Sequence, residues 1–290
     1  MTWKPVVAGV DASREGALAA AMAWAVAEAA RVGCRLVHVT RSLPRVPAGM
    51  DGEQVAASVA SDARQRVAEA LRGNAPPESI DRIEVREGNP AWVLGQAIRE
   101  DGAGLLVLGG KHHAAPVRWF GGSTVHHAVR TIDVPLLVTA AWRGRVGRVL
   151  VATDLSDAAA PTLGAAARFA GLFGAELRAL HVVEPFPPVP DVAVQIDEQQ
   201  HLQTAEAELA SMVAQAAADV AAEPQVRCGT PSRAICDEAA AWDADLVVVG
   251  SHGKGWVDRV LLGSTTERLL SRLPASVLVV PVGGHAPSDR

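Results

Sequence analysis

Short runs of apolar residues, each ended by a glycine, a proline or a charged residue, recur along the chain. Residues 246–249 read LVVV before Gly250, and residues 277–280 read VLVV before Pro281. A stretch with helical character starts between them, at Gly263. Apolar runs of this length, rich in β-branched residues and joined through a helix, are typical of parallel strands buried on both faces. The pattern therefore predicts a βαβ unit over this segment.

The same alternation of strand and helix occurs twice along the chain. Five strands are predicted in each half: residues 6–10, 36–39, 83–85, 105–108 and 136–138, then residues 149–153, 180–183, 225–227, 246–249 and 277–280. A repeat of about 140 residues indicates a duplicated domain, because the units of a solenoid have about 20–50 residues. The join is expected near residues 143–145, which predicts two domains, 1–143 and 144–290.

Each predicted domain alternates strands with helices. This order favours an α/β fold with a mostly parallel sheet and helices on both faces. Ser13 and Ser156 follow the first strand of each half and are expected to cap the next helix, since serine is a preferred N-cap residue.

Composition narrows the classes of function. The chain has 290 residues, 49% of them apolar, and a formal net charge of −5 without a dense basic cluster, which argues against nucleic acid or an anionic membrane as partner. No signal-peptide pattern opens the sequence, and no apolar run approaches the roughly 20 residues of a membrane span, so we expect a soluble, cytoplasmic protein. Cys34, Cys228 and Cys236 have no paired spacing and are expected to be small buried residues in a reducing compartment.

A glycine-rich loop follows the strand at residues 246–249. Its glycines are Gly250, Gly253 and Gly263, and Ser264 completes the spacing G-x2-G-x9-G-S. A glycine-rich turn that leads into a helix N-terminus exposes backbone N–H groups, and the helix dipole adds positive potential there. The loop therefore has the chemistry of a phosphate site.

This spacing, between a strand reading VVVGSHG and a final strand reading SVLVVP, resembles the universal stress protein family, and the resemblance covers essentially the whole chain. It implies two tandem Rossmann-like domains of the adenine nucleotide alpha hydrolase-like type, each a five-stranded parallel sheet of order 3-2-1-4-5. In that order the chain reverses between the first and fourth strands, where open α/β sheets bind ligands. Asp154 and Gly250 end those two strands and should face one crevice.

The resemblance also implies a ligand, ATP or a related adenine nucleotide (ADP or AMP), with Mg²⁺ as a possible companion. Asp154 would accept hydrogen bonds from ribose hydroxyls, a role that suits a carboxylate better than contact with phosphates. Backbone near Val182 would meet the adenine. The phosphates would be bound by the glycines of the loop together with Ser264, Thr265 and Lys254.

The first half departs from this pattern. Its weaker set of equivalent residues is Asp11, Val39, Gly109, Gly122, Ser123 and Thr124. His112 stands where the second glycine is expected, and its Cβ would hinder the approach of phosphate to backbone. We expect this site to be weaker, altered or empty, although Lys111 and a charged His112 leave anion binding open.

Histidines raise the question of a metal. His112, His113, His126 and His127 lie near the loop of the first half, but no cysteine or carboxylate completes an evident ligand set, so no metal site is predicted. His38 and His181 lie inside apolar strands and are expected to be satisfied core histidines.

No catalytic motif accompanies the loop. G-x4-G-K-[ST], H-E-x-x-H and G-x-S-x-G are all missing from the sequence, and without an evident general base we expect no rapid ATP hydrolysis. Three functions remain open: an ATP-binding regulatory protein of the stress response, a nucleotide-independent interaction protein, and a slow ATPase or phosphotransferase. We also expect the halves to form an intramolecular pseudo-dimer through their final strands, with a protein partner and a homodimer as further possibilities.

Overall fold

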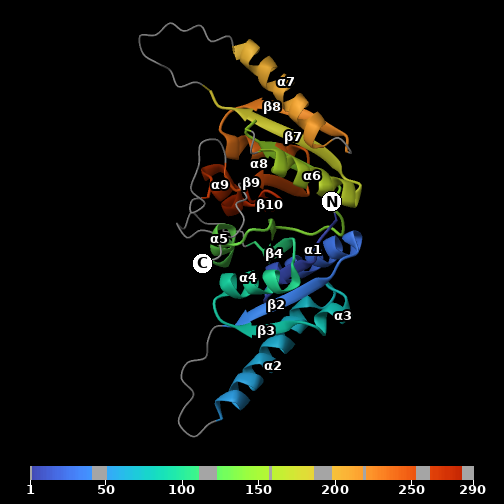
Figure 1. The fold of residues 1–290 in the computed structure, drawn as a ribbon, viewed down its shortest axis with the longest axis vertical. Coiled ribbons are helices and arrows are strands. Elements are labelled where there is room, and N and C mark those ends of the chain that lie inside the picture. Colours follow the sequence, from blue (N-terminus) through green and yellow to red (C-terminus); the bar gives the residue numbers. More distant parts are fainter. Residues whose placement is uncertain are drawn as a thin grey trace, which may run out of the picture. The chain divides into compact units, whose positions relative to one another are not determined.

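The computed structural model describes residues 2–40, 51–110, 123–156, 159–185, 198–217, 220–252 and 262–282 (Figure 1). The chain divides into two compact units, Met1–Trp142 and Arg143–Arg290. Among the described segments, no helix combines the length and apolar character that a membrane crossing requires.

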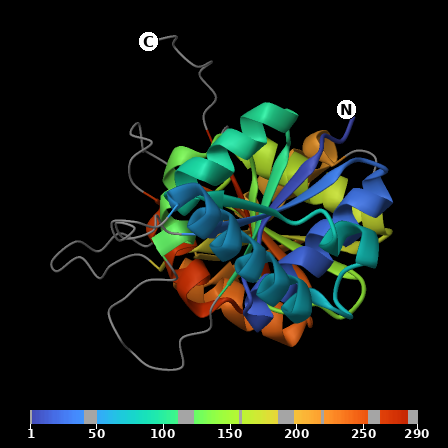
Figure 2. The ribbon, with the colours of Figure 1, turned by 90° about the horizontal axis from the view of Figure 1, so that it is seen from below.

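The first unit is a parallel sheet in the order β3-β2-β1-β4-β5. Its strands are β1 (Val6–Gly9), β2 (Cys34–Thr40), β3 (Glu84–Glu87), β4 (Leu105–Gly109) and β5 (Leu136–Thr139). Its helices are α1 (Arg14–Ala30), α2 (Gly52–Leu71), the short α3 (Pro77–Ile80), α4 (Pro90–Asp101) and α5 (Ser123–Thr131). Helix α1 packs with α2 and α4 packs with α5, and Figure 2 shows helices on both sides of the strands.

The second unit repeats this arrangement, in the order β8-β7-β6-β9-β10. Its strands are β6 (Arg148–Thr153), β7 (Glu176–Val183), β8 (Ala222–Cys228), β9 (Leu246–Gly250) and β10 (Ser276–Val280). Its helices are α6 (Ala160–Phe173), α7 (Glu198–Ala216), α8 (Pro231–Ala241) and α9 (Ser264–Arg272). The predicted fold class and the strand order 3-2-1-4-5 are confirmed in both units.

The core of each unit lies on both faces of its central strands. In β4 and β9 the first four residues are all buried, and Leu106 and Leu246 have no accessible surface. Burial on two faces explains why these strands are continuous apolar runs and do not alternate with polar residues. The edge strands β3 and β8 are more exposed and carry charged side chains.

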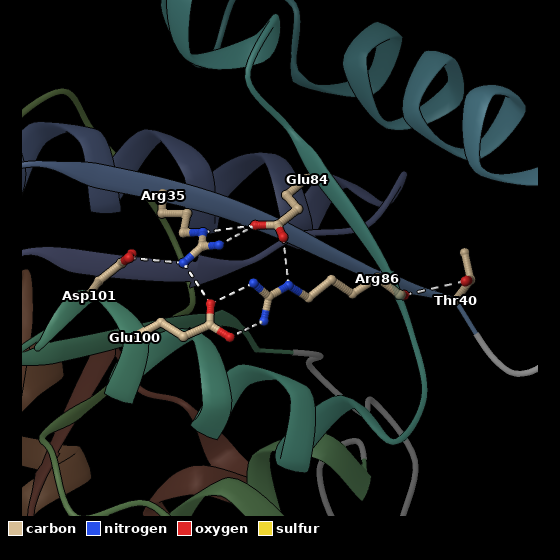
Figure 3. Close-up of polar contacts among 6 residues, drawn as sticks. All are labelled: Arg35, Thr40, Glu84, Arg86, Glu100 and Asp101. Carbon is tan, nitrogen blue, oxygen red and sulfur yellow. Dashed lines mark hydrogen bonds and ion pairs between the residues drawn. The ribbon is translucent and has the colours of Figure 1, made fainter. Parts of the chain in front are cut away.

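Charged side chains connect the edge strand of the first unit to its neighbours. Arg35 on β2 and Arg86 on β3 both contact Glu84, at 2.7 and 2.6 Å, and Arg86 also contacts Glu100 of α4 at 2.6 Å. Figure 3 shows the two guanidinium groups bridged on both sides, by Glu84 and by Glu100. Hydrogen bonds to Glu100 and Glu84 raise the pKa of Arg86 above its usual range. The network holds β3 to β2 and α4.

The second unit has a similar network that is centred on one buried carboxylate. Arg178 of β7 and Arg227 of β8 contact the two oxygens of Glu238, at 2.7 and 3.0 Å, and Glu238 is only 5% exposed. Arg178 also contacts the exposed Glu223 at 2.7 Å and lies 4.3 Å from the centre of the Trp242 ring. Glu238 is therefore the shared counter-ion of two arginines.

The three cysteines differ in environment. Cys34 at the start of β2 and Cys236 in α8 are partly buried, whereas Cys228 at the end of β8 is exposed. The expectation that all three are buried is therefore wrong for Cys228, because an edge strand leaves its last residues in solvent. Burial raises the pKa of the Cys34 thiol to about 12.

We expect thiol reagents to modify Cys228 first and Cys34 last at pH 8, because the thiolate is the reactive form and Cys34 keeps its proton there. Time-resolved labelling with a colorimetric disulfide reagent measures the order, and Cys228→Ser should remove the fast phase. Equal rates for Cys34 and Cys228 would contradict this difference in environment.

The raised pKa of Cys34 also predicts how stability depends on pH. At pH values between the ordinary pKa of a thiol and about 12, Cys34 ionises only in the unfolded chain, so its contribution to the free energy of unfolding should fall as pH rises.

Candidate functional site

A cavity of about 600 Å³ opens in the second unit at the carboxyl ends of β6, β7 and β9. This is the edge at which open α/β sheets bind ligands. Six of the residues predicted to bind the nucleotide line it: Asp154, Val182, Gly250, Gly263, Ser264 and Thr265. Gly253 and Lys254 lie outside the described residues.

Asp154 follows the end of β6 and is held by one of its two oxygens. Its Oδ1 accepts hydrogen bonds from the backbone N–H and the hydroxyl of Ser156, at 3.1 and 2.7 Å. Its Oδ2 is buried and has no hydrogen-bond partner among the residues described. A buried acceptor without a donor is costly. Asp154 therefore has a fixed orientation and one oxygen that suits a hydroxyl of a ligand.

The backbone at the end of β7 supplies a second polar group. The carbonyl of Val183 accepts a hydrogen bond from Gly229 N–H at 3.0 Å, on the β8 side of the strand. In a central parallel strand, the backbone N–H and C=O groups of successive residues point to opposite neighbouring strands. Those of Val182 therefore point to the β6 side. Strand β6 ends at Thr153, whose partner is His181. The carbonyl of Val182 therefore faces the cavity beyond the end of β6.

His181 and His38 occupy equivalent positions in the two units. The Nδ1 atom of His181 lies 2.9 Å from the carbonyl oxygen of Thr153, and that of His38 lies 2.8 Å from the carbonyl oxygen of Val10. A carbonyl only accepts hydrogen bonds, so each Nδ1 carries the proton. Both side chains bond to the backbone as expected, but the prediction that they are core residues is wrong, because both are half-buried and His181 lines the cavity.

The opposite end of the cavity is formed where β9 meets α9. Gly263, the N-cap of α9, donates its N–H to the carbonyl of Ser251 at 2.9 Å, and Thr266 donates its hydroxyl to the carbonyl of Gly250 at 2.8 Å. The N-cap Gly263 provides no side-chain hydrogen bond, so within the described part of the chain the N–H groups of the first turn are open to another acceptor. The start of α9 has the chemistry of an anion site, because helix N-termini carry positive potential.

A second helix N-terminus borders the same cavity. Helix α6 begins at Ala160, its N-cap Ala159 provides no side-chain hydrogen bond, and its first turn has no acidic residue. Ala159 and Thr162 line the cavity. The prediction that Ser156 caps this helix is wrong, because α6 begins only at Ala160 and its N-cap is Ala159, three residues after Ser156. Positive potential from both α6 and α9 is thus available to a bound anion.

His252 is a cavity residue that the sequence reasoning missed. Its Nδ1 lies 3.0 Å from the hydroxyl of Ser251, which also accepts the N–H of Val282, and its Nε2 is buried without a partner in the described part of the chain. Its place inside the G-x2-G spacing was the available signal. Glu184, which follows β7, and His201 of α7 also line the cavity and had no signal in the sequence.

The first unit has a smaller cavity at the equivalent place, of about 290 Å³. Asp11, Val39, Gly109 and Thr124 line it, and Ser123 begins α5. Gly122, Lys111, His112 and His113 lie outside the described residues, while His126 and His127 lie on α5. Within the described ranges, no group of three or more His, Cys, Asp or Glu residues could hold a metal ion.

The start of α1 explains the smaller volume. Helix α1 begins at Arg14, three residues after Asp11, whereas α6 begins six residues after Asp154. A Cβ on Gly16 would stand 2.4 Å from the carbonyl oxygen of Asp11, and a Cβ on Gly109 would stand 2.6 Å from the backbone of Glu15. The first turn of α1 therefore lies directly against the ends of β1 and β4.

Comparisons with known proteins agree with the repeat. The sequence profile described as the universal stress protein family matches residues 2–140 and again residues 146–281. A universal stress protein of Mycolicibacterium smegmatis is 28% identical over 292 residues, which cover 95% of this chain and 96% of that protein. One of Mycobacterium tuberculosis is 29% identical over 295 residues, covering 94% and 96%.

A solved structure has a similar fold over nearly the same length. The crystal structure of a universal stress protein from Archaeoglobus fulgidus superposes with a TM-score of 0.67 at 20% identity, covering 96% of this chain and 98% of that one. This likeness concerns the fold alone.

Proposed function

The chain belongs to the universal stress protein family, and from that premise we propose that its second unit binds ATP or a related adenine nucleotide for a regulatory purpose in the stress response. One observation carries the proposal. Asp154, whose Oδ2 is buried and has no hydrogen-bond partner among the described residues, lines the same cavity as the start of α9, where the N-cap Gly263 gives no side-chain cap. One end of the cavity accepts hydrogen bonds and the other attracts negative charge.

The nucleoside would lie along the ends of β6 and β7. Ribose hydroxyls are donors, and Asp154 Oδ2 is an acceptor without a partner in the described chain. The exocyclic amine of adenine is also a donor, and the carbonyl of Val182 suits it because β6 ends at Thr153. Both contacts use acceptors that the described residues leave open, which supports a nucleoside over a simple phosphate.

The phosphates would lie at the starts of α9 and α6. Gly263, Ser264 and Thr265 line this end, and the glycine allows the backbone to approach closely. A cavity of about 600 Å³ is within the range of about 300–1,000 Å³ that is usual for small-molecule sites. Charge and volume therefore both support a phosphorylated ligand in the second unit.

The direct test is to identify and count the bound nucleotide. Gentle denaturation of the purified chain followed by mass spectrometry should release an adenine nucleotide, and calorimetry on the stripped protein should give one ATP per chain. Recovery of no nucleotide together with no heat on adding ATP would contradict the proposal and favour a nucleotide-independent interaction protein. Release of ADP at a steady rate would favour the slow ATPase.

Assembly and location belong to the same proposal. Duplication of a domain tends to retain an older contact between identical copies, which supports an intramolecular pseudo-dimer. A cytoplasmic location, a further homodimer and an unidentified protein partner are proposed on the family resemblance. Sedimentation of the intact chain, with and without ATP, tests whether two chains associate.

A further inference from the structure

The cavity of the first unit keeps the nucleoside side of the site and changes the phosphate side. Asp11 follows β1 as Asp154 follows β6, and Val39 has the place in β2 that Val182 has in β7. The carbonyl of Thr40 accepts a hydrogen bond from the N–H of Gly88, on the β3 side of the strand. The carbonyl of Val39 therefore points to the β1 side, at a level beyond the last residue of β1. Acceptors for a ribose and for an adenine amine are therefore present in both units.

The difference lies at the start of α1. Glu15 lines the cavity of the first unit, and its backbone and Cβ lie within 2.6–2.8 Å of the place where a Cβ on Gly109 would stand. The backbone and Cβ of Glu15 thus lie beside the end of β4, and its side chain brings a negative charge to this cavity. In the second unit the side chain next to Gly250 on the corresponding helix is the neutral Thr162.

The anion-binding capacity of α1 is already used by its own residues. The hydroxyl of Ser13 accepts the N–H of Gly16 at 3.1 Å, and Glu15 is an acidic residue in the first turn, where the helix dipole stabilises a carboxylate. Helix α6 has neither a side-chain cap nor an acidic first turn. A phosphate would meet the helix dipole at α6, whereas at α1 it would meet the like charge of Glu15 inside the cavity, since Arg14 of the same turn is exposed and does not line it.

The volumes of the two cavities also favour a smaller ligand without phosphates in the first unit. The first cavity has about 290 Å³ and the second about 600 Å³. The smaller value lies at the lower limit for small-molecule sites. It suits a nucleoside better than the same nucleoside with a triphosphate.

We propose that the first unit binds an uncharged nucleoside of the adenosine type, and that Glu15 is the residue that excludes its phosphorylated forms. The proposal rests on the function proposed for the second unit, because the ribose and adenine contacts are carried over from that site. The chain then holds one site for a nucleotide and one for a nucleoside.

Equilibrium dialysis of the intact chain with radiolabelled adenosine tests this. Two equivalents should bind in the absence of ATP, and one should remain when unlabelled ATP is in large excess. In Glu15→Gln, ATP should displace that remaining equivalent at a concentration at least tenfold lower than in the unaltered chain. Glu53→Gln is the matched control, since Glu53 is the acidic residue in the first turn of α2 and lines neither cavity.

The outcomes separate the two proposals. Displacement of both equivalents by ATP in the unaltered chain, or binding of only one adenosine in total, would overturn the inference about the first unit. A Glu15→Gln chain that holds its adenosine against ATP as firmly as the Glu53→Gln control would overturn the role of Glu15. Failure of ATP to displace any adenosine would instead contradict the function proposed for the second unit and would still support exclusion of phosphates by the first.

Discussion

Replacing Glu238 with glutamine is expected to lower the free energy of unfolding of the second unit by about 3 kcal/mol. Glu238 is buried and is the shared partner of Arg178 and Arg227, at 2.7 and 3.0 Å. Removing its charge leaves two neighbouring guanidinium groups without their common counter-ion. The effect should lie at the lower end of the range for buried ion pairs, because the side chain of Arg227 is 48% exposed and can be hydrated.

Glu223→Gln is the control for this prediction. Glu223 contacts the same Arg178 at 2.7 Å, but its side chain is 61% exposed, so its loss should cost at most about 1 kcal/mol. Urea unfolding followed by circular dichroism measures both, with the transition of the second unit fitted separately from that of the first. Equal losses in the two variants would show that burial of Glu238 does not decide the strength of the network.

Asp154→Ala is expected to weaken the binding of ATP, ADP and AMP by similar factors, because all three carry the ribose that Asp154 would contact. Loss of a charge-assisted hydrogen bond should cost about 1.5–3 kcal/mol, which is roughly tenfold or more in affinity. Calorimetry with the three nucleotides provides the measurement.

Ser264→Ala is expected to behave differently. Ser264 is the first residue of α9 and lines the phosphate end of the cavity, so ATP should lose most affinity and AMP least. Ser271→Ala is the matched control, because Ser271 lies on the same helix and donates its hydroxyl to the carbonyl of Glu267 at 2.9 Å. It should leave all three affinities unchanged.

The reverse pattern would overturn this orientation of the ligand. An Asp154→Ala effect confined to ATP, with a Ser264→Ala effect independent of phosphate number, would place the carboxylate near phosphate-bound Mg²⁺. That result would favour the phosphotransfer function.

Most of the fold was predictable because the central strands are buried on both faces and therefore appear as uninterrupted apolar runs. Strand β8 was predicted as residues 225–227 but spans Ala222–Cys228. It is an edge strand in which polar residues and Pro224 are tolerated, so its sequence has no apolar run. The short helix α3 has four residues, too few for a helical period to be visible.

The sequence identified the site residues that follow the ends of strands. It did not identify those whose place depends on where a helix begins. Asp154 and Gly250 follow apolar strands, and the reversal of strand order places both beside one crevice. The role of Glu15 depends on α1 beginning three residues after Asp11, which the similar sequences after β1 and β6 did not indicate. Glu238 lies 60 residues from Arg178 along the chain, and no local pattern links such residues.

The two cavities, of about 600 and 290 Å³, are encoded in a single polypeptide. In an assembly of identical single-domain chains, every substitution appears in every copy, and all sites change together. A tandem chain can instead place Glu15 beside the end of β4 in one unit while the neutral Thr162 lies beside the end of β9 in the other. Covalent duplication also sets the ratio of the two unlike sites at one to one during synthesis, whatever the protein concentration in the cell.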